Sequence, residues 1–146
     1  MAKNMIFGDV PSLRRVVEVG SNVAPGTPVR TAFGPGVTLT GSGDYKPKAS
    51  TLEGVEYEVR DRGGVGLGDK EATVAFSGSF AFDITHSKPA SVKAGDLVVM
   101  ADASSRELTI AGADSTPDAA TVFGVIEFVR STDADSADVV VRIGAN

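Results

Sequence analysis

The sequence contains no cysteine and no tryptophan, and among its 146 residues there are only one histidine and two tyrosines. The absence of cysteine excludes disulfides, thiolate metal sites and cysteine nucleophiles, and it is typical of a protein made in a reducing cytoplasm. The scarcity of tryptophan and tyrosine argues against a carbohydrate-binding module, because such modules hold sugars on exposed aromatic rings.

A basic surface and a long hydrophobic run are also missing. The net charge is -5, which disfavours nucleic acid and anionic membranes as partners, since both are bound by clusters of Lys and Arg. No apolar run is long enough to span a bilayer. Residues 1–60 carry a net charge of +1, whereas residues 61–146 carry -6. There are two interpretations of this difference. The acidic residues of 61–146 only keep the protein in solution, or this part faces water while the near-neutral part, residues 1–60, docks on a partner.

The best-defined element is the segment 71–85, in which apolar and polar residues alternate as in a β-strand. The apolar parity contains Ala72, Val74, Phe76, Phe80, Phe82 and Ile84. The polar parity, which we expect to face outward, contains Thr73, Ser77, Ser79, Asp83 and Thr85. Because the run is longer than a usual strand, Gly78 is predicted to mark a bend where one ribbon serves two sheets.

Further strand signals recur between glycines and prolines, with almost no helical period. We predict strands at 14–19, 27–33, 37–40, 55–60, 72–84, 96–101, 107–111, 121–129 and 139–143. The first of these also fits a short helix start, but its β-branched valines favour a strand. One capped helical turn is expected at 116–120.

The chain is therefore predicted to be all-β. Residues 13–146 should form a single compact domain, barrel-like or sandwich-like, with short strands and long Gly/Pro loops, and residues 1–12 an extended N-terminal arm. The predicted core contains Phe76, Phe80, Phe82, Phe123, Ile126 and Val141.

A weak internal repeat relates residues 23–76 to residues 92–143. The pattern Val-x-x-Gly-x-x-Val occurs at 23–29 and again at 92–98, with later matches at nearly the same offset. Either the similarity is chance, because this pattern is common in all-β proteins, or two similar β units pack on each other.

Few residues have catalytic potential. His86 is the only histidine, and no Gly-x-Ser-x-Gly sequence supplies a nucleophile for it, so we interpret it as a surface turn residue. The glycines of 63–68 have the spacing of a phosphate-binding loop, but Asp69, Lys70 and Glu71 follow where Lys and Ser or Thr are required. This segment is therefore predicted to be a turn, and no catalytic residue is assigned.

An acidic loop is the one candidate for a metal site. Asp133, Asp135 and Asp138 offer oxygen ligands suited to calcium. The loop lacks the central Gly and the terminal Glu of a calcium-binding helix-loop-helix, and Asp-rich hairpin tips are common. We interpret it as a solvated loop, and we expect neither a metal nor a cofactor.

Five segments follow one another in an order that carries a family resemblance. They are 68–82 (Gly-Asp-Lys-Glu-Ala-Thr-Val-Ala-Phe-Ser-Gly-Ser-Phe-Ala-Phe), 92–98 (Val-Lys-Ala-Gly-Asp-Leu-Val), 102–109 (Asp-Ala-Ser-Ser-Arg-Glu-Leu-Thr), 122–125 (Val-Phe-Gly-Val) and 139–144 (Val-Val-Val-Arg-Ile-Gly). With the opening Met-Ala-Lys-Asn, they resemble the tailed-phage capsid decoration (cement) proteins of the DUF2190 type. The resemblance implies a protein that binds the outside of an icosahedral head as small oligomers. Residues 34–54 depart from the pattern as a longer insertion rich in Pro, Gly and Lys.

From this resemblance we expect a structural accessory protein, not an enzyme, on the capsid exterior of a virion and made in the host cytoplasm. The expected partners are the major capsid protein and further copies of the chain, with a trimer favoured over a dimer. Candidate contact residues are Met5, Ile6 and Phe7 in the arm and Tyr45, Lys46 and Lys48 in the insertion. The arm either lies on a neighbour, or is a frayed end or the protein's own edge strand. The alternative function is a small β-barrel binding module, for a carbohydrate or a protein ligand, or a small hydrolase.

Overall fold

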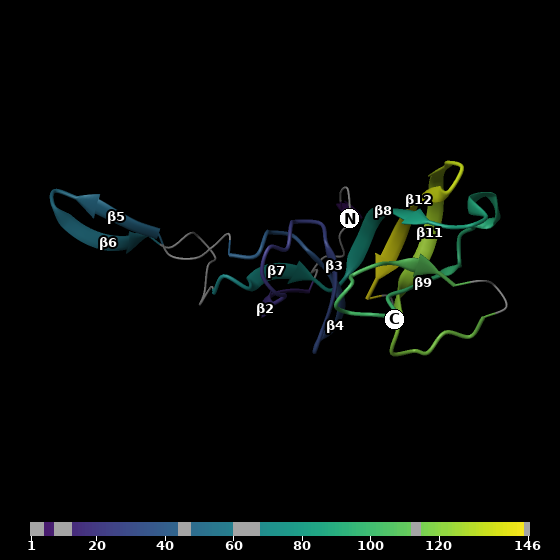
Figure 1. Cartoon of the computed structure of the whole chain (residues 1–146), viewed down its shortest axis with the longest axis horizontal. Helices are drawn as coiled ribbons and strands as arrows, with labels where there is room; N and C mark the ends of the chain where they lie inside the picture. Colours follow the sequence, from purple (N-terminus) through teal and green to yellow (C-terminus); the bar gives the residue numbers. More distant parts are fainter. Residues whose placement is uncertain (1–4, 8–12, 44–47, 60–67, 112–114, 145–146) are drawn as a thin grey trace.

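The computed structural model describes residues 5–7, 13–43, 48–59, 68–111 and 115–144, and these form strands joined by turns (Figure 1). The strands are β1 Met5–Phe7, β2 Arg14–Glu18, β3 Pro28–Thr31, β4 Gly34–Thr38, β5 Lys48–Leu52, β6 Val55–Val59, β7 Glu71–Ala75, β8 Gly78–Thr85, β9 Leu97–Val99, β10 Thr109–Ile110, β11 Val122–Thr132 and β12 Ser136–Ile143. The one helical element in these ranges is the short 3-10 turn η1, Pro89–Ser91. The all-β prediction is confirmed. None of the described residues form a helix with the length and apolar character needed to cross a membrane.

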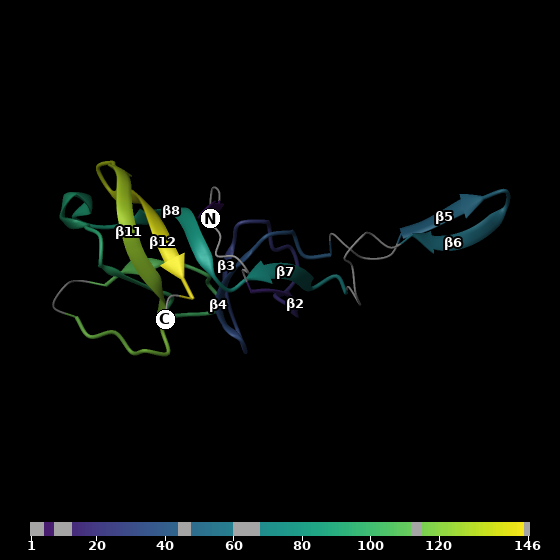
Figure 2. The same cartoon turned by 180° about the vertical axis from the view of Figure 1, so that it is seen from behind.

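The strands form three antiparallel sheets (Figures 1 and 2). The largest has the order β1-β8-β12-β11-β9-β10, and it curls so that β10 approaches β8. A four-stranded sheet has the order β2-β7-β4-β3, and β5 pairs with β6 alone. The two copies of the sequence repeat contribute to different sheets, since β3, β4 and β7 lie in the four-stranded sheet and β9 to β12 in the six-stranded sheet.

One continuous ribbon connects the two larger sheets. β7 is an inner strand of the four-stranded sheet and β8 an inner strand of the six-stranded sheet, and only Phe76 and Ser77 separate them. Gly78 has a φ of 122°, a conformation that glycine adopts without the steric conflict that a Cβ would cause. The predicted bend at Gly78, with one ribbon serving two sheets, is confirmed.

The apolar parity of this ribbon faces two different clusters. After the bend, Phe80, Phe82 and Ile84 belong to the main core, which lies mostly within the curled six-stranded sheet and also includes Val37 and Ala75 of the four-stranded sheet. Before the bend, Val74 and Phe76 pack with Val29 in a smaller cluster on the four-stranded sheet. All six predicted core residues are buried. The single apolar face read from the sequence thus becomes two faces in the folded protein, because the ribbon turns between them.

The opposite parity of the ribbon is not uniformly exposed. Asp83 and Thr85 are exposed as predicted, but Ser79 is buried, together with the small Ala75 and Ala81. The expectation that Ser79 faces outward is therefore wrong. Because Ala75, Ser79 and Ala81 are buried along with the apolar parity, this part of the ribbon is covered on both faces.

Two arginines tie the four-stranded sheet and its adjoining loop to the other half of the protein. Arg30 on β3 donates a hydrogen bond from Nη2 to the carbonyl oxygen of Val122, at 2.8 Å. Arg106, which precedes β10, donates from Nη2 to the carbonyl oxygen of Val19, at 2.6 Å. Both arginines are half-buried, and hydrogen bonds from a charged donor are stronger than neutral ones.

The region predicted as a helical turn at 116–120 has a different conformation. The amide of Thr121 donates to the carbonyl of Asp118, and the Asp118 carboxylate accepts from the amide of Ala120. Asp118 therefore closes a turn by bonding to the backbone two residues ahead, which competes with helix formation. The expected helical turn is wrong.

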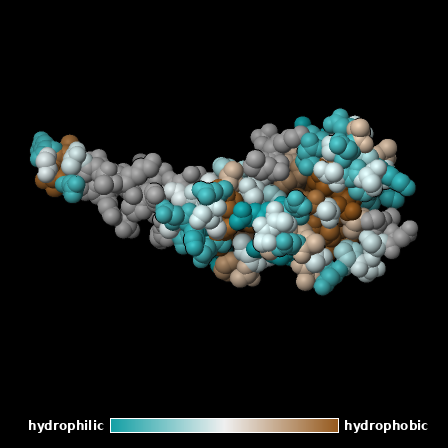
Figure 3. Space-filling view, viewed as in Figure 1, coloured by the Kyte–Doolittle hydropathy of each residue, from teal (hydrophilic) through white to brown (hydrophobic). Residues whose placement is uncertain are grey.

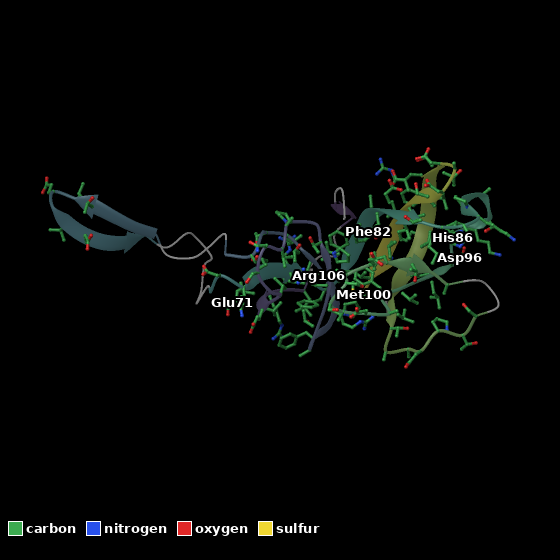
Figure 4. All side chains as sticks on the ribbon, in the orientation of Figure 1. Glu71, Phe82, His86, Asp96, Met100 and Arg106 are labelled. Atoms are coloured by element: carbon green, nitrogen blue, oxygen red, sulfur yellow. The ribbon has the colours of Figure 1, made fainter. Side chains whose placement is uncertain are left out.

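Truncation of Phe82 tests the main core. Its ring packs edge-to-face on Phe123, with centroids 5.8 Å apart, and both side chains are buried (Figure 4 labels Phe82). Phe82→Ala is expected to lower the free energy of unfolding by about 3–5 kcal/mol, because it removes a buried ring and leaves a cavity. Urea unfolding curves measure this change, with the exposed Phe128→Ala as the control for a much smaller effect. An unchanged urea midpoint for Phe82→Ala would contradict the core assignment.

Substitution of Gly78 tests the bend. An alanine at a φ of 122° is strained, so Gly78→Ala is expected to lower the free energy of unfolding by about 1–3 kcal/mol. Gly68→Ala is the matched control, because an added Cβ there meets nothing within 4 Å. Both are compared by urea unfolding. Equal, negligible changes in the two variants would show that the ribbon does not need glycine at the bend.

Candidate functional site

The β5–β6 hairpin is the most distinctive surface feature of the protein. Its strands pair from Lys48 opposite Val59 to Leu52 opposite Val55, across the two-residue turn Glu53–Gly54. Both turn residues have positive φ, 52° and 78°, as in a type I′ turn whose twist matches that of the flanking strands. The predicted strand at 55–60 is confirmed as β6. Within the insertion 34–54, the strand predicted at 37–40 overlaps β4, whereas β5 was not predicted.

This hairpin stands apart from the rest of the fold. It lies at one end of the molecule, away from both larger sheets, in two opposite views (Figures 1 and 2). Within the described residues neither of its strands pairs with a third strand. Its tip exposes two large apolar side chains, with Leu52 65% and Val55 66% exposed. Figure 3 shows this hydrophobic surface on the far-left projection.

A second exposed apolar surface lies on the four-stranded sheet. We call it the Phe33 patch, formed by Leu13, Arg15, Phe33 and Phe76. Phe33, in the β3–β4 turn, is 57% exposed and its ring centroid lies 6.1 Å from that of the buried Phe76. Leu13 is 50% exposed, and its carbonyl accepts the amide hydrogen of Phe76 at 2.8 Å. The guanidinium carbon of Arg15 lies 4.9 Å from the Phe33 ring centroid, a cation–π contact.

The predicted contact residues fall in two places. Met5–Phe7 forms β1, an edge strand paired antiparallel with β8, with Met5 opposite Phe80 and Phe7 opposite Ser79. Residues 5–7 are therefore an edge strand of the protein's own sheet, which is one of the alternatives given for the arm. Tyr45 and Lys46 lie outside the described residues, and Lys48 begins β5.

His86 follows β8, as predicted, and lines a cavity of about 280 Å³ together with Ser91 and Asp96 (His86 and Asp96 are labelled in Figure 4). Sequence reasoning missed this grouping of three residue types that hydrolases use. Each side chain, however, bonds to the local backbone. His86 Nδ1 accepts the amide hydrogen of Lys88 at 3.1 Å, and Ser91 Oγ donates to the Lys88 carbonyl at 2.7 Å. Asp96 accepts the amide hydrogen of Lys93 at 2.9 Å.

These bonds matter for the chemistry of the group. In a catalytic triad the carboxylate accepts a hydrogen from Nδ1 of the histidine, and Nε2 faces the serine. Here Nδ1 of His86 is itself an acceptor, so the neutral imidazole carries its proton on Nε2. The three side chains are therefore arranged as turn-stabilising groups and do not form a hydrogen-bonded relay.

A larger cavity of about 530 Å³ lies between the end of β8 and the segment before β10. It is lined by Pro28, Phe82, Asp83, Ile84, Thr85, Arg106, Glu107, Leu108 and Thr109. Of its charged lining residues, Arg106 already donates to the Val19 carbonyl, and Asp83 and Glu107 are exposed. The arrangement provides an open recess at the edge of the six-stranded sheet.

The acidic loop forms the tip of the β11–β12 hairpin. Asp133 and Asp135 are exposed in the turn, whereas Asp138 belongs to β12, with a carboxylate oxygen 4.0 Å from Arg130 Nη1. In the described part of the chain, no group of three His, Cys, Asp or Glu side chains is arranged to hold a metal ion. The interpretation as a solvated loop is confirmed for Asp133 and Asp135, whereas Asp138 lies in a strand.

The glycine-rich segment 63–68 falls outside the described residues except for Gly68. The amide of Gly68 donates to the carboxylate of Glu71 at 3.0 Å. A negative side chain thus bonds to a backbone amide of the kind that a phosphate-binding loop offers to phosphate. The chain then enters β7, a strand, and so lacks the helix N-terminus that favours a bound anion.

No family model, curated protein or solved structure matches this chain. The resemblance to phage capsid decoration proteins therefore stays a prediction. The surfaces that the structure itself provides are the projecting hairpin, the Phe33 patch and the edge strand β1.

The loop that positions Arg106 contains Asp102, a carboxylate whose pKa is shifted by local hydrogen bonds. The amide of Ser104, followed by its hydroxyl, donates to Asp102 at 2.8 Å, which lowers the pKa of that carboxyl below its ordinary value. The carbonyl of Asp102 also accepts the amide hydrogen of Arg106 at 3.3 Å, and Arg106 has a φ of 57°. The turn thus holds the backbone of Arg106 in place, and the Arg106 side chain reaches the carbonyl oxygen of Val19.

We predict that Ser104→Ala raises the pKa of Asp102 toward its ordinary value, while the remaining amide bond keeps it lowered. When folding lowers the pKa of a carboxyl, that carboxyl stabilises the folded state at every pH above its pKa in the unfolded chain. The stabilisation is lost as the pH falls through the pKa in the folded protein. NMR titration of the Asp102 carboxyl carbon measures the shift, with Ser105→Ala as the control. An identical titration curve in Ser104→Ala would show that the hydroxyl plays no part.

Proposed function

We propose that this protein is a structural accessory of a phage virion, which binds the outer surface of the icosahedral head and stabilises contacts between major capsid protein subunits. The observation that carries the proposal is the β5–β6 hairpin, which projects from the body and exposes Leu52 and Val55 at its tip. A projection of this kind can bridge two neighbouring molecules. Modest affinity at each contact is sufficient when many copies bind one repeating shell.

The distribution of charge gives the proposed orientation. Residues 1–60, with a net charge of +1, supply the hairpin and three of the four strands of the four-stranded sheet. Five of the six strands of the largest sheet come from the segment 61–146, which carries -6. We place the hairpin and the four-stranded sheet toward the shell and the six-stranded sheet toward water.

The edge strand β1 is a further proposed contact. Met5–Phe7 lies at the edge of the six-stranded sheet, and within the described residues its outer side pairs with no strand. An open edge of this kind can accept a strand from another chain. We propose that a segment of the major capsid protein or of an adjacent copy pairs there.

A second candidate function is a small binding domain, favoured by the cavity of about 530 Å³ beside β8. Its volume lies in the range of small-molecule sites, about 300–1,000 Å³. Its open, largely polar lining contrasts with the apolar walls of most such sites, so we rank it below the capsid proposal.

The capsid proposal predicts saturable binding of the purified protein to phage heads that lack it. Sedimentation of heads with increasing protein should give a fixed number of copies per head, and decorated heads should resist heat better than bare ones. Acidic, similarly sized proteins serve as the control for nonspecific binding. Failure of the folded protein to co-sediment at any concentration would contradict the proposal. Turnover of an ester, glycoside or nucleotide that is lost in His86→Ala would instead support an enzyme.

A further inference from the structure

Within the residues that the structure describes, the β5–β6 hairpin pairs with no third strand, and its tip is exposed. Two strands alone are marginally stable in water, and they need a third strand or an apolar surface to cover one face. In the described residues all six positions from Thr51 to Glu56 are exposed, including the apolar pair Leu52 and Val55. The hairpin therefore presents a surface that is incomplete without a further molecule.

The pairing register gives the hairpin two chemically different faces. Leu52 and Val55 are opposite one another in the register and share one face of the hairpin. Glu56 lies on the other face, and Glu53 stands in the turn. Over residues 48–59 there are three Glu and one Lys, so the apolar tip carries a negative charge.

The Phe33 patch has the opposite character. Leu13 and Phe33 flank the buried Phe76 and leave an apolar surface that is half exposed. Arg15, two residues after Leu13 on the same strand face, is exposed and places its guanidinium over the Phe33 ring. Among the described residues, no carboxylate forms a salt bridge with Arg15. The patch is thus an apolar surface with a cation at its edge.

We propose that the hairpin tip of one copy docks on the Phe33 patch of a second copy. Leu52 and Val55 cover the exposed faces of Leu13 and Phe33, and Glu53 approaches Arg15. The match in apolar character and in charge favours this occupant, since each copy presents one tip and one patch. Within one molecule the hairpin lies away from the β3–β4 turn that carries Phe33 (Figures 1 and 2).

The contact joins two different surfaces and is therefore head-to-tail. Such contacts propagate until the chain of molecules closes, and a closed ring leaves no tip or patch unoccupied. This inference rests on the self-association that the family resemblance implies, with the trimer as the expected ring, and does not depend on attachment to a head.

The test uses the full chain in solution and measures mass by sedimentation velocity. The tip variant is Leu52→Ser with Val55→Ser, and the patch variant is Leu13→Ser with Arg15→Glu. The unsubstituted protein should sediment as a closed oligomer of the 15.0 kDa chain, and both variants as monomers. Phe128→Ser, at an exposed apolar position on the six-stranded sheet, is the matched control and should keep the mass of the oligomer.

Mixing the two variants gives the sharper result. The tip variant keeps an intact patch and the patch variant keeps an intact tip, so a head-to-tail contact predicts a one-to-one dimer in the mixture. A symmetric contact, in which the same surface meets itself, predicts no complex. Oligomers of unchanged mass in the tip variant, or a mixture without dimers, would overturn the proposal, as would a monomeric unsubstituted protein.

A charge exchange separates loss of contact from loss of folding. Glu53→Arg and Arg15→Glu should each weaken association, and the double variant should restore it, which a damaged fold cannot do. Failure of the double variant to recover while circular dichroism shows a native fold would overturn the role of this ion pair. Co-sedimentation of the unsubstituted protein with bare heads, measured separately, tests the capsid proposal whatever surfaces join the copies to one another.

Discussion

The shared ribbon from β7 to β8 is the constraint on which the rest of the structure depends. Because β7 is internal to one sheet and β8 to the other, neither sheet can move away without breaking the pairing on both sides of the ribbon. The bend at Gly78 also divides the apolar residues between two clusters, with Phe76 in one and Phe80 in the other. Arg30 and Arg106 then fix the separation between the two halves by bonding to backbone carbonyls across it.

Sequence alternation predicted the elements that are long and strongly amphipathic. The segment 71–85, its bend and all six core residues could be found because their signals are local. The burial of Ser79 and Ala81 could not, since small residues fit either face of a strand and only the packing of the folded protein over that face decides. β1 was missed because a strand of three residues depends on pairing with Phe80, more than seventy positions away.

The interaction surfaces were only partly predictable. The sequence of β5, Lys-Ala-Ser-Thr-Leu, has little strand character, and Glu53–Gly54 is a less typical hairpin turn than Asn-Gly or Asp-Gly, so β6 was predicted but β5 and the hairpin were not. The Phe33 patch joins residues from β2, the β3–β4 turn and the ribbon. No local pattern links them, and their exposure follows only from the folded arrangement.

The central place of β12 has a consequence for how the chain acquires its fold during synthesis. β12 pairs with β8 along its whole length and with β11 on its other side, and it supplies Val139, Val141 and Ile143 to the main core. The ribosome releases β12 after the other strands that the structure describes. Until β12 has been synthesised, the phenylalanines of β8 lack the strand that pairs with them, and their apolar surface is open to chaperones and to aggregation.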